Sequence, residues 1–253
     1  MQKNVPKYAP DWVRTVKVWA EASHRDVAYA LCDDRRTLLW FANQRAVEYH
    51  PGLVTADRTD HVTHLVLDLD PPEGSGFDVV VTVAHAVHAA LDQVGLSAAV
   101  KTSGAKGIHV FVPVADDTAP EDLAAAARAL AVRSAALVPD VATTAFVKAD
   151  RGGKVFVDST RVGGATVVAA YSPRVRPGTP VSFPVSWDEL DVVAPTDFTV
   201  HTALDRLGDG DPWAEQMPAA QTLPEAVVAE GHEIPIPRVE AMQEGKRRAR
   251  KKA

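Results

Sequence analysis

The sequence predicts an α+β fold in which a largely antiparallel sheet is flanked by helices. Short segments with apolar side chains at every second position indicate strands, and longer segments with the apolar spacing of a helix lie between them. Along residues 62–158 the order is strand, helix, strand, strand, helix, strand. Consecutive strands joined by a short turn pair antiparallel, so this order favours an antiparallel sheet with helices packed on it.

The first 60 residues predict a hairpin followed by a helix. Apolar alternation over residues 13–18 and 27–31 indicates two strands, and residues 33–36 read as the turn after them. Residues 38–49 have a helical pattern, and the dipeptide Pro51-Gly52 is expected to end that helix.

The strand expected over residues 62–70 is the central one. Its leucines alternate with Val66, Asp68 and Asp70, so the two aspartates share the face opposite the leucines. The elements expected after it are a helix over 77–94, strands over 97–102 and 108–114, a helix over 120–137, strands over 154–158 and 165–171, and short helices over 187–190 and 195–207.

Composition indicates a single domain over residues 1–210 and a flexible tail over 211–253, where Pro, Glu, Gln and Ala dominate. No apolar run is long enough to span a bilayer, and no apolar segment typical of a signal peptide follows Met1, so no membrane partner and a cytoplasmic location are expected. The single cysteine, Cys32, fits a reducing compartment and is expected in the core.

Charge is distributed unevenly along the chain. The net charge is −6, yet residues 246–252 carry 6 of the 27 basic residues, which leaves 21 basic against 33 acidic residues and a balance of −12 elsewhere. This balance argues against a protein whose whole surface binds nucleic acid. The basic tail is either a solubilising terminus or a segment that contacts nucleic acid, and composition leaves both open.

Three aspartates are candidate metal ligands. Asp68 and Asp70 have Cα atoms roughly 6.6 Å apart on one face of a strand, so their carboxylates can converge on a hard cation such as Mg²⁺ or Mn²⁺. Alternation places Asp158 on the ligand-facing side of its own strand, and three such carboxylates could hold two metals about 3.5 to 4 Å apart. The alternatives are that the first two cap a turn before Pro71 and that Asp158 is an ordinary residue at a strand end.

A glycine-containing turn, Ser-Gly-Ala-Lys-Gly, joins the next two strands. Gly104 and Gly107 allow positive φ and close approach of the backbone to a ligand. Backbone N–H groups, the Ser103 hydroxyl and the Lys106 ammonium predict an anion pocket, and His109 can donate to the same phosphates. The Walker A pattern is absent. The alternative is a plain hairpin turn with a solvent-facing lysine.

Together these motifs resemble the polymerase domain of bacterial DNA ligase D, in the archaeo-eukaryotic primase superfamily. The matching segments are residues 67–74, 102–109, 153–158 and 170–174, and the similarity runs from about residue 2 to beyond residue 190. The resemblance implies an RRM-like primase-polymerase core in a stand-alone chain. It also implies template-dependent addition of NTPs or dNTPs to DNA ends or gaps in double-strand break repair by non-homologous end joining.

Cofactors, partners and location follow from the same resemblance. It implies a two-metal site for Mn²⁺ or Mg²⁺ and a DNA substrate with a 5′-phosphorylated gap or end. It also implies Ku and a separate ATP-dependent DNA ligase as partners, and a nucleoid-associated location.

Residue roles are implied position by position. Arg151 matches a basic residue near the template, with a solvated loop charge as the alternative. Family members have a DNA-gripping stretch ahead of this chain's start, for which Lys3, Lys7 and Trp12 are weak substitutes. The positions implied as catalytic metal ligands are Asp68, Asp70 and Asp158. The positions implied to contact the nucleotide are Ser103, Gly104, Lys106, Gly107, His109, Arg174 and His50.

Two other classes of function remain. A catalytically impaired module that binds DNA ends or acts as a scaffold, recruited through its basic tail, would act with a separate ligase and Ku without incorporating nucleotides. A phosphatase of the Asp-x-Asp type is disfavoured, because that motif requires Thr or Val two residues after its second Asp, where this chain has Pro72.

Overall fold

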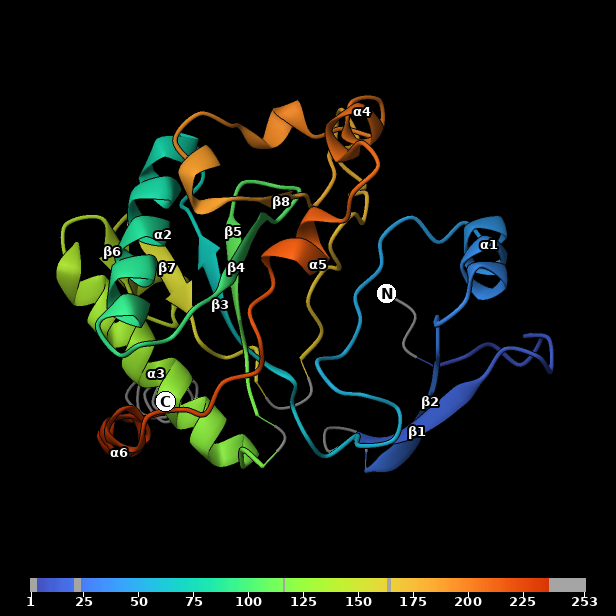
Figure 1. Ribbon diagram of the computed structural model, residues 1–253, viewed down its shortest axis with the longest axis horizontal. Coiled ribbons are helices and arrows are strands. Elements are labelled where there is room, and N and C mark those ends of the chain that lie inside the picture. Colours follow the sequence, from blue (N-terminus) through green and yellow to red (C-terminus); the bar gives the residue numbers. More distant parts are fainter. Residues whose placement is uncertain (1–3, 21–23, 116, 163–164, 237–253) are drawn as a thin grey trace, which may run out of the picture.

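The strands form two sheets in the computed structural model, which describes residues 4–20, 24–115, 117–162 and 165–236. The strands are β1 (Thr15–Ala20), β2 (Arg25–Ala30), β3 (His64–Asp70), β4 (Ala99–Thr102), β5 (Ile108–Pro113), β6 (Ala142–Thr143), β7 (Val155–Asp158) and β8 (Pro184–Val185). β1 and β2 make a hairpin, and the others make a six-stranded sheet in the order β6-β7-β3-β5-β4-β8. Within the larger sheet only the β6–β7 pair is parallel, so the predicted α+β class with a largely antiparallel sheet is confirmed (Figure 1).

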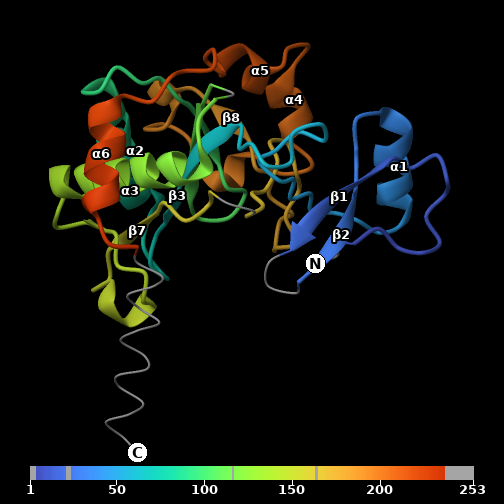
Figure 2. The same cartoon turned by 90° about the horizontal axis from the view of Figure 1, so that it is seen from below.

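Two long helices cover the six-stranded sheet. α2 (Phe77–Asp92) and α3 (Pro120–Leu137) contact each other and β3, and α6 (Glu225–Glu233) packs across α3 (Figures 1 and 2). The other helices are α1 (Arg35–Asn43), α4 (Ala203–Leu207), α5 (Pro212–Gln216) and the 3₁₀ helices η2 (Lys148–Asp150), η3 (Trp187–Glu189) and η4 (Pro195–Asp197). In the described part of the chain, no helix is both long and apolar enough to cross a membrane.

The main core lies between these helices and the sheet. Val80, Val83 and Val87 recur at helical spacing and are fully buried, which explains why residues 77–92 fold as a helix against the sheet. From β3, Leu65 and Leu69 are also fully buried. Burying one such side chain contributes roughly 1.5 to 3 kcal/mol, so this layer holds the central strand in place.

The hairpin and α1 lie to one side of the six-stranded sheet in both views (Figures 1 and 2). Aromatic contacts hold this region together: the Trp12 and Trp40 rings meet edge to face at 6.5 Å, and the Arg36 guanidinium lies 3.8 Å from the centroid of the Trp12 ring. The side chain of Asp34 caps α1 by accepting from the backbone N–H of Thr37. Cys32, expected in the core, is exposed here.

The first helix is shorter than predicted. It ends at Asn43, because the chain turns at Arg45, whose φ is +64°. Beyond this turn the backbone N–H of Tyr49 donates to Ser172 Oγ and its carbonyl accepts from Ala169 N–H. Residues 46–50 therefore run extended to reach the second half of the chain, which the local helical pattern does not reveal.

The strand predicted over residues 165–171 is wrong. β7 pairs with β3 and β6 instead, and its expected partner forms only an isolated bridge between Thr166 and Gly52. The N–H of Val167 donates to the carbonyl of Pro51. Long-range pairing decides this segment, because the partners of Thr166, Val167 and Ala169 lie more than a hundred residues away in sequence.

The flexible tail predicted from residue 211 is wrong for residues 212–236. α5 and α6 form there, and α6 buries Val227 and Gly231 against α3. The prediction failed because only a few apolar residues, spaced for a single helix face, anchor this otherwise polar segment. Residues 237–253, including the basic cluster at 246–252, lie outside the described residues.

Candidate active site

A row of four polar side chains crosses the six-stranded sheet. Asp68 in β3 is the cross-strand partner of Asp158 in β7 and of His109 in β5, and His109 is the partner of Lys101 in β4. Residues directly opposite each other on neighbouring strands point to the same face, so these four side chains lie in line. Strand alternation predicted the facing of three of them, whereas the register that aligns them comes from the sheet.

Asp68 and Asp158 converge on one guanidinium group. Arg161 Nη2 lies 2.7 Å from Asp68 Oδ2 and 3.1 Å from Asp158 Oδ2. Burial would raise the pKa of the Asp68 carboxyl, but the adjacent His109 and Arg161 hold it at about 2. Asp68 is therefore a carboxylate at neutral pH. Sequence reasoning missed Arg161, although its position three residues after Asp158 was a usable signal.

Asp70 lies two residues beyond Asp68 on the same strand and is exposed. Partial burial and the negative charge of Asp68 raise the pKa of Asp70, and they outweigh the opposing charges of Lys106 and Arg151. At this end of β3 the raised pKa therefore reflects burial first and repulsion by Asp68 second. A cation bound there would relieve the repulsion.

The carboxylates suit a hard divalent cation. A single nitrogen of Arg161 contacts both Asp68 and Asp158, so both carboxylates can reach one positive centre, and carboxylate oxygens are the ligands that Mg²⁺ and Mn²⁺ prefer. Among the described residues, however, no three His, Cys, Asp or Glu side chains are already gathered as a metal site. The carboxylate donors therefore fit Mg²⁺ or Mn²⁺, and the Arg161 guanidinium lies where Asp68 and Asp158 would bind the ion.

His109 and Lys101 continue the row on the other side of Asp68. His109 Nε2 lies 3.3 Å from Asp68 Oδ1, and its Nδ1 lies 2.9 Å from Lys101 Nζ, which also donates to Ser182 Oγ at 2.6 Å. Burial, with the nearby lysine, lowers the pKa of His109 to about 4, so the ring is neutral at pH 7. Because a carboxylate can only accept, the ring proton belongs on Nε2, and Nδ1 accepts from Lys101.

Lys101 is fully buried, and burial lowers the pKa of its ammonium to about 7. It was not among the residues predicted from sequence. The available signal was a lysine inside an apolar strand, between Val100 and Thr102, just before the glycine turn.

Both glycines of the turn are required by their surroundings. Gly104 has φ +66°, and a Cβ there would lie 2.7 Å from the backbone nitrogen of Ser182. A Cβ on Gly107 would lie 2.3 Å from the carbonyl oxygen of Leu69. The turn therefore packs directly against β3, close to the carboxylates.

The turn uses two of the amides that the sequence assigned to an anion pocket. Ser103 Oγ accepts from the N–H of Ala105 at 3.2 Å and from that of Gly107 at 3.1 Å. Lys106 is exposed at the tip, where its charge acts on Asp70. The hydroxyl proton of Ser103 and the Lys106 ammonium thus remain as the donors that the turn presents to a ligand.

Arg174 and His50 meet beside this turn. Arg174 Nη1 donates to the carbonyl of Ser103 at 2.5 Å, and Arg174 Nε lies 3.3 Å from Glu48 Oε2. The same Glu48 oxygen lies 3.0 Å from His50 Nε2. The structure therefore brings together two residues predicted at the nucleotide, through a glutamate that sequence reasoning missed although it stands two positions before His50.

Arg151 lies beside Asp70, at the end of β3. Its Nη1 is 4.0 Å from Asp70 Oδ2, and its guanidinium lies 3.9 Å from the centroid of the Phe156 ring. It also donates to the carbonyls of Ala145 and Phe146, each at 3.3 Å. These contacts hold the side chain close to the site, and they replace the simple solvated charge that was the alternative.

Lys7, predicted to contact DNA, does not lie in the row of polar side chains. Lys7 is exposed in the segment before β1, and within the described residues no hydrogen bond or ion pair joins it to the carboxylates. Lys3 lies outside the described residues.

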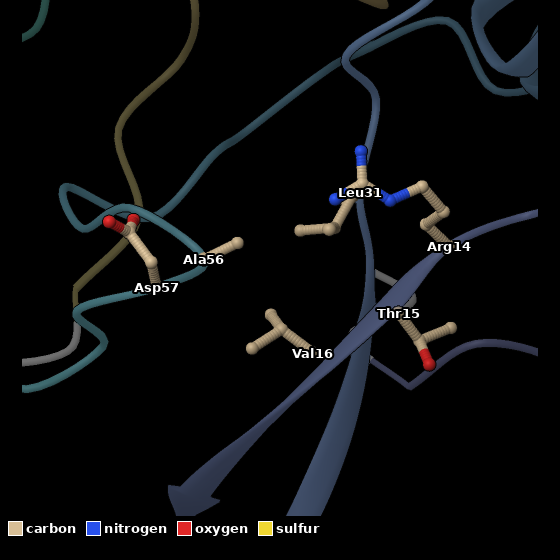
Figure 3. Close-up of a pocket in the computed structure, with 6 residues that line it drawn as sticks. All are labelled: Arg14, Thr15, Val16, Leu31, Ala56 and Asp57. Carbon is tan, nitrogen blue, oxygen red and sulfur yellow. The ribbon is translucent and has the colours of Figure 1, made fainter.

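The hairpin of β1 and β2 borders a separate cavity of about 550 Å³ (Figure 3). The residues that line it are Arg14, Thr15, Val16, Leu31, Ala56 and Asp57.

Comparison with known proteins agrees with this geometry. Residues 1–213 match the family model described as the LigD primase-polymerase domain. The chain is 31% identical over 209 residues to the bifunctional non-homologous end joining protein LigD of Bacillus subtilis, covering 81% of this chain and 33% of that protein. It is 33% identical over 223 residues to the multifunctional non-homologous end joining DNA repair protein LigD of Mycobacterium tuberculosis, covering 83% and 29%. It thus spans about a third of the length of these relatives.

A solved structure supports the same relationship. The polymerase domain from Mycobacterium tuberculosis ligase D in complex with DNA superposes with a TM-score of 0.76 at 31% identity, covering 87% of this chain and 79% of that one. The family resemblance and the fold predicted from the motifs are both confirmed. The chain belongs to the LigD primase-polymerase domain family.

Proposed function

We propose that the chain is a metal-dependent nucleotidyltransferase that adds NTPs or dNTPs to DNA ends or gaps under template direction. Its setting would be double-strand break repair by non-homologous end joining. The observation that carries the proposal is the pairing of Asp158 with Asp68 on β3, the strand against which the glycine turn that bears Lys106 packs. The names of the LigD relatives, and the DNA bound to the related polymerase domain, support the assignment.

The residues around the turn would bind the triphosphate. Lys106 and Arg174 place two positive charges at the turn, and the Ser103 hydroxyl adds a neutral donor. His109, whose Nε2–H donates to Asp68, would contact the phosphates only by changing this partner. Donors fixed in advance lower the barrier to phosphoryl transfer, because charge develops on the phosphate oxygens without reorganisation of the site. Glu48 would hold Arg174 and His50 in register with the turn.

Asp68, Asp70 and Asp158 would hold Mg²⁺ or Mn²⁺. When bound, such ions would lower the pKa of the primer 3′-hydroxyl and stabilise the negative charge that develops at the α-phosphate. The three carboxylates project from adjacent strands, so the sheet would keep their spacing constant while substrates exchange. Arg151, beside Asp70, would contact the template strand.

The partners proposed on the same grounds are macromolecular. The substrate would be DNA with a 5′-phosphorylated gap or end on the nucleoid. Ku and a separate ATP-dependent DNA ligase would complete joining. Lys3 and Lys7 would add weak contacts to the DNA.

The test is primer extension on a gapped, 5′-phosphorylated duplex with Mn²⁺, comparing ribonucleotides and deoxynucleotides. We expect the wild-type chain to extend the primer and Asp158→Asn to lose about a thousandfold in rate, the order lost when one preorganised charge partner is removed. Asp191→Asn is the matched control, because Asp191 pairs with His85 on the surface and should leave the rate unchanged.

Two results would contradict the proposal. Full activity in Asp158→Asn would show that the paired carboxylates do not take part in the reaction. DNA binding by the wild-type chain without incorporation of either nucleotide would instead favour the end-binding or scaffolding module.

A further inference from the structure

Arg161 occupies the point at which the two buried carboxylates meet. Its Nη2 contacts Asp68 Oδ2 at 2.7 Å and Asp158 Oδ2 at 3.1 Å, while the side chain itself is about one-third exposed. Its Nε is buried and has no hydrogen-bond partner among the described residues. The guanidinium is therefore held at this point by the two aspartates.

The position of Arg161 follows from electrostatics. Asp68 and Asp158 are directly paired on neighbouring strands, and their side chains are only 14% and 9% exposed. Two carboxylates that lie this close together and are shielded from solvent repel each other strongly unless a cation lies between them. Arg161 is the residue that supplies this cation, and it reaches the pair from the loop that follows β7.

We propose that Arg161 is an internal counter-ion that occupies the carboxylate pair in the metal-free protein and competes with the metal for it. The inference rests on the proposed function, because it takes Asp68 and Asp158 as metal ligands. A divalent ion and the guanidinium need the same carboxylate oxygens, so one must leave when the other binds. Arg161 then stabilises the empty site and weakens metal affinity.

Metal binding tests this directly, with Mn²⁺ alone as the probe and no nucleotide or DNA. We expect Arg161→Met to bind Mn²⁺ about tenfold more tightly than wild type, the effect of removing one charge-assisted competitor. The free Mn²⁺ signal in electron paramagnetic resonance titrations gives the affinity. Circular dichroism first establishes that the variant is folded.

Arg151→Gln is the matched control. It removes the same charge beside Asp70 but not from the carboxylate pair, since Arg151 lies 4.0 Å from Asp70 Oδ2. We expect it to change Mn²⁺ affinity much less than Arg161→Met. Equal tightening in both variants would mean that general charge, not competition for the pair, sets the affinity, and would overturn the proposal.

Thermal melting gives a second readout. In EDTA, Arg161→Met should melt about 3 °C or more below wild type, because the two carboxylates lose the guanidinium that lies between them. Saturating Mn²⁺ should remove this difference. Unchanged or weaker Mn²⁺ binding in Arg161→Met would overturn the inference alone, whereas absence of Mn²⁺ binding in both wild type and variant would overturn the proposed metal site as well.

Discussion

At the scale of single residues, Lys101 determines how His109 is presented. Its Nζ donates to Nδ1 of the ring, so the Nε2–H faces Asp68. Ser182 Oγ donates a hydrogen bond to the carbonyl of Thr102, and its lone pair accepts from Lys101 Nζ. Burying an ammonium group costs free energy, which the hydrogen bonds to His109 and Ser182 partly offset. The same contact fixes one tautomer of His109 inside the site.

The buried ammonium predicts a pH dependence of stability. Burial lowers the pKa of Lys101 from 10.5 to about 7, so the unfolded chain binds more protons than the folded one between these values. The destabilising effect of Lys101 is therefore complete below pH 7 and declines as pH rises toward 10.5. We expect Lys101→Met to be more stable than wild type at pH 6 and to lose this advantage by pH 10.

Urea unfolding of both proteins at pH 6 to 10, followed by circular dichroism, measures the difference directly. Groups remote from Lys101 titrate alike in both chains and cancel in the comparison, whereas His109 loses the lysine that lowers its pKa. A difference in the free energy of unfolding that stays constant with pH would show that Lys101 does not carry the buried charge.

At the scale of elements, α6 is attached to α3 by an unusually close approach. A Cβ on Gly231 would lie 1.9 Å from the carbonyl oxygen of Ala125, so the two backbones nearly touch. Arg128 donates to the carbonyl of Gly231 at 2.9 Å, and Arg133 forms an ion pair with Glu230. This contact explains why a polar segment near the C-terminal end belongs to the folded body.

Gly231→Ala should reverse the usual helix preference. In an exposed helix the change would stabilise by about 1 kcal/mol. Here we expect a loss of about 2 kcal/mol or more in the free energy of unfolding, because the added methyl forces α6 away from α3. Denaturant unfolding measures it, with Glu233→Ala on the exposed side of α6 as control. A stabilised Gly231→Ala variant would mean that the helices do not meet this closely.

At the scale of the whole molecule, two distant stretches of chain assemble one end of the site. Residues 49–52 run beside residues 166–169, where the Ala169 N–H donates to the carbonyl of Tyr49. This pairing positions Glu48 next to Arg174, and it links the N-terminal hairpin region to the six-stranded sheet. The nucleotide side of the site thus depends on contacts between both halves of the chain.

Charge at the same scale predicts where DNA affinity arises. Outside residues 246–252 the chain has a balance of −12, so this cluster of 6 basic residues is the natural source of non-specific attraction. Replacing all six by Gln should weaken DNA binding and reduce the slope of log K against log salt by up to about 5, since each neutralised phosphate contributes about 0.9. Fluorescence anisotropy at several salt concentrations measures both. An unchanged slope would identify the cluster as a solubilising terminus.

Local pattern was sufficient for much of this protein. Apolar periodicity predicted α2 and α3 almost to the residue, and alternation placed Asp68, Asp158 and His109 opposite the apolar side chains next to them in their strands, on the one face of the sheet that they share. It failed where partners are remote: for residues 44–49, for 165–171 and for α6. In each case the conformation depends on hydrogen bonds or packing with segments far away in sequence.

The sequence by itself determined the α+β class, the family and the three carboxylates with their glycine turn, because these depend on residue type and short spacing. Only the tertiary structure decided the register that aligns Lys101 with His109 and the aspartates, and the placement of Arg161 between two of them. Register and charge pairing are set by the energy of the assembled sheet, in which strands from distant parts of the chain must match all their partners at once.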